Sequence, residues 1–145
     1  MAVKSIAIAA DHAGFALKAS LAEELKSTGY EVIDLGTRDG TTSVDYPDFG
    51  KAVAEAVTSG KADAGVVVCG TGIGISIAVN RHPGARAALC HDVTSARLSR
   101  EHNDANVLAL GARMTGEQVA KDCLHTFLTT DFAGDRHLRR VQKLG

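Results

Sequence analysis

The segment AGVVVCGTGIG, residues 64–74, joins an apolar run to a glycine-rich turn. Its first six residues are apolar at every position rather than at alternate positions. Such a run is typical of a central parallel strand that helices cover on both faces. The glycines after it indicate a turn from this strand into a helix. We therefore expect residues 64–69 to form the middle of a parallel sheet.

Short β-rich runs alternate with longer amphipathic stretches along the rest of the chain. The predicted strands are residues 4–10, 31–35, 64–69, 86–90 and 107–110. Three helical stripes lie between or after them: Phe15, Leu17, Leu21 and Leu25; Phe49, Val53, Ala56 and Val57; Val119, Cys123 and Phe127. The alternation predicts an α/β fold, a three-layer α/β/α Rossmann-like sandwich on a five-stranded parallel sheet with right-handed crossovers. We expect a single domain over residues 1–145.

Three residues or pairs predict where helices begin. Asp92 is suited to cap a helix that runs to about Arg100, and Pro47 fits the first turn of another helix. Thr115 and Gln118 have the spacing of a capping box.

The last ten residues form a basic segment without an acidic residue. Its charges come from Arg136, His137, Arg139, Arg140 and Lys143. One interpretation is a solvated helix end, where cations are favoured by the helix dipole. The other is a short extra helix that has no strand to cover and packs on a second subunit.

The composition excludes several classes of protein. A net charge of −1 does not favour general binding to nucleic acid, and no apolar run is long enough to span a membrane. The N-terminus lacks the pattern of a secretory signal, so we expect a cytoplasmic protein. The three cysteines are widely spaced, which argues against a disulfide framework or a zinc cluster. No spacing typical of a metal site occurs.

Polar residues gather after the predicted strands, where parallel sheets bind ligands. Asp11 and His12 follow the first strand, Cys69 and its glycine turn end the third, and Arg113 follows the fifth. His91 and Asp92 follow the fourth. We expect these groups to meet along one edge of the sheet.

The glycine turn and Cys69 each have two interpretations. The turn either exposes backbone N–H groups to an anion or only allows a helix and a strand to pack closely. Cys90 and Cys123 are interpreted as small buried apolar residues. Cys69 differs because it opens onto a helix start, which favours a thiolate. Such a thiolate is a nucleophile if a histidine is held beside it, or a base if the substrate is a carbon acid.

Histidine and arginine supply further candidates. His102 lies in the polar segment 100–104, which is either a capped turn or part of a site. Arg113, Arg136 and Arg140 are suited to bind a phosphate, and the last two share a helical face.

Five motifs, in order, resemble the ribose-5-phosphate isomerase B family, which also includes the galactose-6-phosphate isomerase subunits. They are DHAGF with LK (residues 11–15 and 17–18), DYP (45–47), CGTGIGISIA (69–78), SREHNDANVL (99–108) and GDRH with RV (134–137 and 140–141). The likeness covers the chain from the first strand to the C-terminal helix. Some members carry a glutamate where this chain has Ile75 and lack the strand-end cysteine, so the likeness is to the thiol branch.

The resemblance implies an aldose–ketose isomerase that uses neither a metal nor a cofactor and moves a proton between C2 and C1 through a cis-enediolate. It implies that Cys69 is the base, that Thr71 assists proton transfer and that His102 opens the furanose ring. The implied substrate-binding residues are Asp11, His12, Tyr46, Gly70, Gly72, Ile73, Gly74 and Asn103. The implied phosphate-binding residues are Arg113, Arg136 and Arg140.

Members of the family place their site between two subunits, which implies a homodimer, and a dimer of dimers is a further option. The expected substrate is ribose 5-phosphate. A six-carbon substrate such as allose 6-phosphate or galactose 6-phosphate, a non-catalytic sugar-phosphate-binding module, and thiol-based acyl transfer remain alternatives. Acyl transfer requires His102 to lie beside Cys69.

Overall fold

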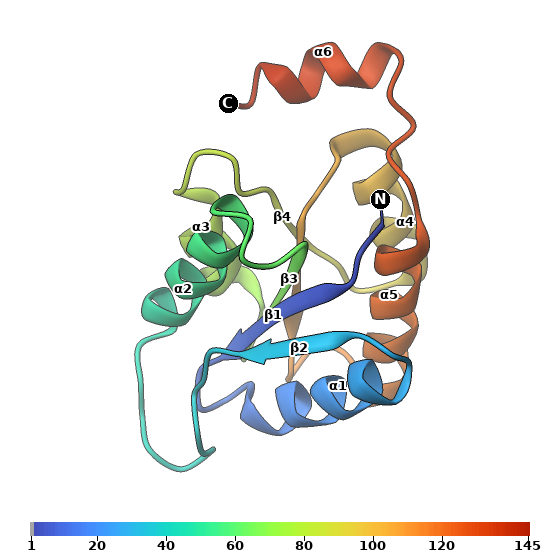
Figure 1. The fold of residues 1–145 in the computed structure, drawn as a ribbon. Helices are drawn as coiled ribbons and strands as arrows, with labels where there is room; N and C mark the ends of the chain where they lie inside the picture. Colours follow the sequence, from blue (N-terminus) through green and yellow to red (C-terminus); the bar gives the residue numbers. More distant parts are fainter. Residues whose placement is uncertain (1) are drawn as a thin grey trace.

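The computed structural model describes residues 2–145 and contains one five-stranded sheet. All neighbouring strands are parallel, in the order β2-β1-β3-β5-β4 (Figure 1). The strands are β1 (Ser5–Ala10), β2 (Glu31–Asp34), β3 (Ala64–Cys69), β4 (Ala87–Leu89) and β5 (Val107–Gly111). Every residue of β3 is buried, so the prediction of a central strand is confirmed. The short edge strand β4 omits Arg86 and Cys90, which were predicted to belong to it.

Helices cover both faces of the sheet and make three layers (Figure 1). On one face, α1 (Phe15–Ser27), α4 (Val93–Asn103) and α5 (Glu117–Thr129) pack on the strands. On the other face lie α2 (Tyr46–Thr58) and α3 (Ile73–Asn80). The predicted α/β/α sandwich is confirmed. No helix among residues 2–145 is both long and apolar enough to cross a membrane.

Two of the predicted helix starts are confirmed and one is wrong. Asp92 accepts a hydrogen bond from the N–H of Ser95 at 2.7 Å, and Pro47 lies in the first turn of α2. Thr115 does not cap α5. Its hydroxyl donates instead to the carbonyl of Gly111 at 3.0 Å, and Gly116 occupies the cap position.

Two details of the predicted helices also differ from the structure. α4 continues past Arg100 to Asn103. In the stripe predicted for α5, Cys123 and Phe127 are buried but Val119 is 42% exposed, because the buried face of that helix passes through Ala120 and Leu124 rather than through Val119.

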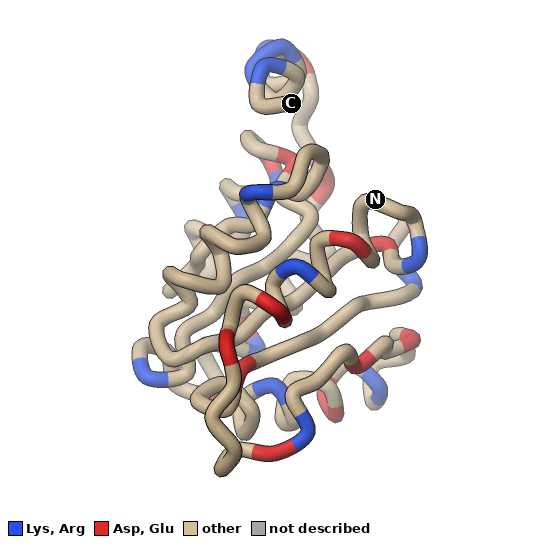
Figure 2. The backbone as a smooth tube through the Cα atoms, turned by 90° about the vertical axis from the view of Figure 1, so that its left-hand side faces the viewer, with Lys and Arg blue, Asp and Glu red and all other residues tan. Residues whose placement is uncertain are grey.

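The basic segment forms a separate helix, α6 (Arg136–Gln142), which packs against α4 rather than against the sheet (Figure 1). His137 and Val141 are its buried residues. Arg136, Arg139 and Arg140 are exposed, and Figure 2 shows basic residues along this helix at the top of the view. The interpretation as an extra helix without a strand to cover is confirmed.

Candidate active site

A cavity of about 420 Å³ opens at the carboxyl ends of β1, β3 and β5. It is lined by residues from four segments that are distant in the sequence. They are Asp11, His12, Ala13, Tyr46, Cys69, Gly70, Thr71, Ile73, Gly74 and Arg113. The expectation that the polar residues after these three strands meet at one edge is therefore confirmed. His91 and Asp92, which follow β4, are not among the lining residues.

The turn from β3 to α3 is held against the end of β5 by contacts that leave no room for side chains. Gly72 has a φ of 77°, and a Cβ on it would lie 2.5 Å from Cδ1 of Leu89. A Cβ on Gly111 would lie 2.5 Å from the carbonyl oxygen of Thr71. Gly72 is buried behind the turn and shapes it, while Gly70, Thr71, Ile73 and Gly74 form the wall of the cavity.

Cys69 closes β3 and is 4% exposed at the floor of this cavity. Its Sγ accepts a hydrogen bond from the N–H of Gly72 at 3.1 Å. That bond and the start of α3 both favour negative charge on the sulfur. The geometry thus suits a thiolate.

The other two thiols lie in the opposite core. Burial raises the pKa of Cys90, and burial followed by the neighbouring Cys90 raises the pKa of Cys123 to about 11. Both residues therefore remain neutral thiols near pH 7, and their interpretation as buried apolar residues is confirmed.

Asp11 and His12 are fixed by backbone hydrogen bonds. Oδ1 of Asp11 accepts from the N–H of Gly14 at 3.0 Å. Nδ1 of His12 accepts from the N–H of Val44 at 3.2 Å. When the imidazole is neutral, its proton is therefore on Nε2, which makes His12 a donor to a ligand oxygen.

Two larger side chains border the glycine turn. Tyr46 lies against Gly74, where an added Cβ would come within 2.6 Å of its ring. The guanidinium of Arg113 lies over Gly70, and Nη1 would be 3.4 Å from a Cβ there. Arg113 thus places a positive charge in the same cavity as Cys69.

His102, Asn103 and Arg140 line a second cavity of about 280 Å³ between α4 and α6. Its other lining residues are His137, Val141 and Leu144. Arg136 is exposed at the start of α6. Within one chain, the predicted site residues therefore fall into two groups, and His102 does not line the cavity of Cys69. The pair of His102 and Cys69 that acyl transfer requires is therefore not formed within one chain.

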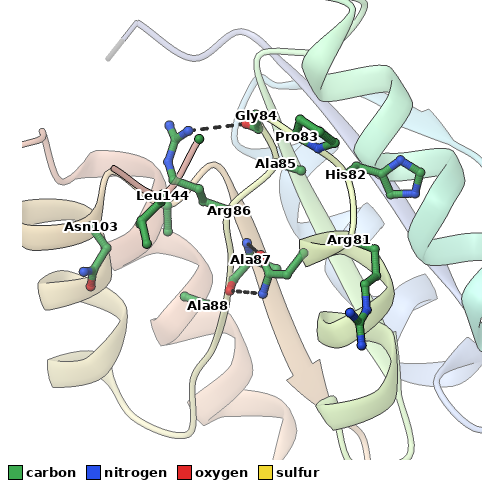
Figure 3. Close-up of a pocket in the computed structure, with 13 residues that line it drawn as sticks. Arg81, His82, Pro83, Gly84, Ala85, Arg86, Ala87, Ala88, Asn103 and Leu144 are labelled. Atoms are coloured by element: carbon green, nitrogen blue, oxygen red, sulfur yellow. Dashed lines mark hydrogen bonds between the residues drawn. The ribbon is translucent and has the colours of Figure 1, made fainter. Parts of the chain in front are cut away.

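A third and larger cavity, of about 610 Å³, lies between the loop before β4 and the C-terminus. Figure 3 shows Arg81 and His82 on one side of it and Asn103 and Leu144 on the other. Arg86 is engaged within the chain, because its Nε donates to the carbonyl of Asp104 and its Nη1 to that of Gly84. Asn103 is the predicted site residue in this lining.

Comparisons with known proteins show the family of the chain. A family model described as Ribose/Galactose Isomerase matches residues 6–144. The chain belongs to the ribose/galactose isomerase family. The resemblance inferred from the five motifs is confirmed, and so is the expectation of an isomerase.

Individual relatives cover almost the whole chain. The solved structure of Clostridium thermocellum ribose-5-phosphate isomerase B has a TM-score of 0.96 and 57% identity, over 97% of this chain and 95% of that chain. Ribose-5-phosphate isomerase B of Escherichia coli is 45% identical, over 98% of this chain and 95% of that protein. Galactose-6-phosphate isomerase subunit LacB of Clostridium acetobutylicum is 44% identical, over 95% of this chain and 79% of that protein.

The structure adds further observations to the site. Ile75 is fully buried in the core, so its side chain does not reach the cavity. Ala13 lines the cavity, and sequence reasoning missed it because a methyl group carries no chemical signal. His137 was also missed, although its spacing of four residues from Val141 indicates a shared buried face. Residues 2–145 contain no group of three or more His, Cys, Asp or Glu suited to hold a metal ion.

Proposed function

We propose that the chain interconverts ribose 5-phosphate and ribulose 5-phosphate through a cis-enediolate. The observation that carries this proposal is the position of Cys69, at the floor of a cavity shared with Asp11, His12 and Arg113. Relatives named ribose-5-phosphate isomerase B, at 45% and 57% identity, support the five-carbon substrate.

Cys69 acts as the base in this mechanism. Its thiolate takes the proton from C2 of the open-chain aldose, and the electrons of that bond form the C1–C2 double bond as O1 becomes an oxyanion. The proton then returns from Cys69 to C1, while the O2 proton passes to O1 with the help of Thr71. The product is the ketose, and no atom is gained or lost.

The start of α3 supports the charged species. The N-terminal end of a helix carries partial positive charge. This charge favours the Cys69 thiolate and, after the proton transfer, the negatively charged enediolate. The N–H of Gly72 is engaged by Sγ, and the N–H of Ile73 donates to Oγ1 of Thr71 at 3.2 Å. These bonds hold the base and the hydroxyl at adjacent points of the turn.

The remaining residues come from a second copy of the chain in this proposal. His102, Asn103 and Arg140 border a cavity of their own, and Arg136 is exposed beside them. A homodimer that sets this group over the partner's Cys69 cavity joins ring opening by His102 to proton transfer by Cys69. The phosphate then lies among Arg113 of one chain and Arg136 and Arg140 of the other.

The test is turnover of ribose 5-phosphate by the wild type and by Cys69→Ala, with a chelator present. Loss of a positioned base lowers kcat by roughly 10²- to 10⁴-fold. Cys90→Ala is the matched control, because it removes a thiol that lies outside the cavity. Unchanged turnover by Cys69→Ala contradicts the assignment of the base, and loss of turnover with the chelator contradicts a metal-independent reaction.

A six-carbon sugar phosphate is the second candidate, favoured by the 44% identity to the galactose-6-phosphate isomerase subunit. Discrimination by one added carbon is modest, about 10- to 200-fold. Comparison of kcat/KM for allose 6-phosphate and galactose 6-phosphate with kcat/KM for ribose 5-phosphate ranks these substrates. Tight binding of ribose 5-phosphate without entry of solvent deuterium would instead indicate a binding module.

A further inference from the structure

His137 is a buried imidazole in a helix whose other polar side chains are largely exposed. It is 7% exposed, whereas Arg136, Arg139 and Arg140 on the same helix face solvent. Its ring is stacked on that of His102, with centroids 4.4 Å apart and planes inclined by 15°. His137 therefore provides a direct contact between α6 and the residue assigned to ring opening.

The chain leading into α6 is tied to α4 close to this stacked pair. The N–H of Ala133 donates to the carbonyl of Glu101 at 3.0 Å, and Nε of Arg100 donates to the carbonyl of Thr130 at 3.0 Å. On α4, the acceptor Glu101 and the donor Arg100 both lie within two residues of His102. These bonds set α6 over the end of α4, so the stack belongs to a defined local structure.

The surroundings of His137 favour its neutral form. Desolvation of the ring, and then the charges of Arg136, His102 and Arg140, lower its pKa, while Asp135 acts in the opposite direction. The charged groups at the end of α4 are held in ion pairs. Arg100 pairs with Asp104, and Glu101 pairs with Arg97 one turn earlier.

Two stacked imidazoles cannot both be charged without strong repulsion at this separation. His102 is the more accessible of the two, because it is half-buried and lines the cavity between α4 and α6. We propose that His137 is a positioning residue that fixes the plane of the His102 ring and leaves to His102 the single proton that the pair carries during ring opening. This inference rests on the proposed function.

The step itself balances within the substrate. His102 takes the proton of the anomeric O1–H, whose electrons form the C1=O bond as the bond between C1 and the ring oxygen O4 breaks. The same proton is delivered to O4, which becomes a hydroxyl. A neutral ring stacked on His102 leaves both the uptake and the release of this proton to His102.

The test separates ring opening from proton transfer at carbon. Ribose 5-phosphate is mainly a closed furanose, whereas ribulose 5-phosphate cannot close a ring through its phosphorylated O5. We expect His137→Ala to lower kcat for ribose 5-phosphate by about tenfold or more, since positioned acid–base groups contribute at least that much. The exchange of a C1 hydrogen of ribulose 5-phosphate with D₂O should keep its wild-type rate.

Two further variants distinguish positioning from packing. His137→Phe keeps an aromatic ring in the stack and should recover most of the kcat lost in His137→Ala. Val141→Ala removes the other buried side chain of α6 and should change turnover and exchange by the same factor. An equal loss of both rates in His137→Ala, or no loss of kcat, would overturn the inference.

NMR titration of the imidazole nitrogens gives an independent readout. In the wild type, the His137 imidazole should stay neutral near pH 7, because desolvation lowers its pKa. A charged His137 ring at this pH would overturn the inference. If the wild type does not exchange the C1 hydrogen, the proposed function is contradicted. The titration still decides, by itself, whether His137 leaves the proton to His102.

Discussion

At the scale of single residues, the shape of the turn after β3 depends on backbone packed directly against backbone. Gly111 ends β5, and a Cβ there would lie 2.5 Å from both the carbonyl carbon and the carbonyl oxygen of Thr71. Gly111 also pairs with Cys69 in the sheet register. The position of the turn after β3 is thus set by a residue that does not line the cavity itself.

We predict that Gly111→Ala destabilises the protein by about 1–3 kcal/mol, because the added methyl group forces the turn away from β5. Turnover of ribose 5-phosphate should also fall, since Thr71 and Cys69 move together. Urea unfolding and steady-state kinetics measure the two effects. Gly116→Ala is the matched control, because a Cβ at Gly116 meets nothing within 4 Å. Equal stability of the two variants would contradict the prediction.

At the scale of elements, the strands and the helices that alternate with them could be predicted from the hydrophobic pattern. The run 64–69 is apolar throughout because both faces of β3 are covered, and that burial is visible in the sequence itself. Helix ends were harder to predict. Thr115 has capping spacing, but its hydroxyl donates to the carbonyl of Gly111 instead, and this competing acceptor depends on the local turn.

The segment between β2 and α2 depends on a buried lysine, Lys18, which belongs to the first of the five motifs but was assigned no role from the sequence. Nζ of Lys18 donates to Oδ1 of Asp34 at 2.8 Å and to the carbonyl of Thr37 at 2.8 Å, and its side chain is 3% exposed. The same segment carries Val44, whose N–H donates to His12. Lys18 thus connects the fold of α1 to the orientation of a site residue.

We predict that Lys18→Met lowers the free energy of unfolding by about 1–3 kcal/mol, because it leaves the Thr37 carbonyl without its donor. KM for ribose 5-phosphate should rise as His12 loses its fixed orientation. Chemical denaturation and kinetics test both effects. Lys51→Met is the control, because Lys51 lies on the surface, 3.9 Å from Glu55, in a pair of little energetic value. A Lys18 variant as stable as this control would refute the prediction.

At the scale of the whole molecule, the separation of the site residues into two cavities is the feature that sequence could not supply. The sorting by strand ends found Asp11, His12, Cys69 and Arg113, because the ends of parallel strands lie at one edge. His102, in contrast, does not follow a strand. It lies near the C-terminal end of α4, before β5, whereas Asp92 lies at the N-terminal end of that helix. The length of that helix carries it away from the Cys69 cavity.

Complementation between two inactive variants tests whether the two groups meet across a dimer. Cys69→Ala removes the thiol from the first cavity, and His102→Ala removes the imidazole from the second. If each site combines the two cavities from different chains, a mixed dimer contains one site with both residues intact and one site with neither. Random pairing of equal amounts makes half of the dimers mixed, and we expect the mixture to regain about a quarter of the wild-type turnover after subunit exchange. Each variant alone should remain impaired, as should a mixture of Cys69→Ala with Cys69→Ser. No recovery in the exchanged mixture would mean that each chain assembles its site alone, which contradicts the shared site.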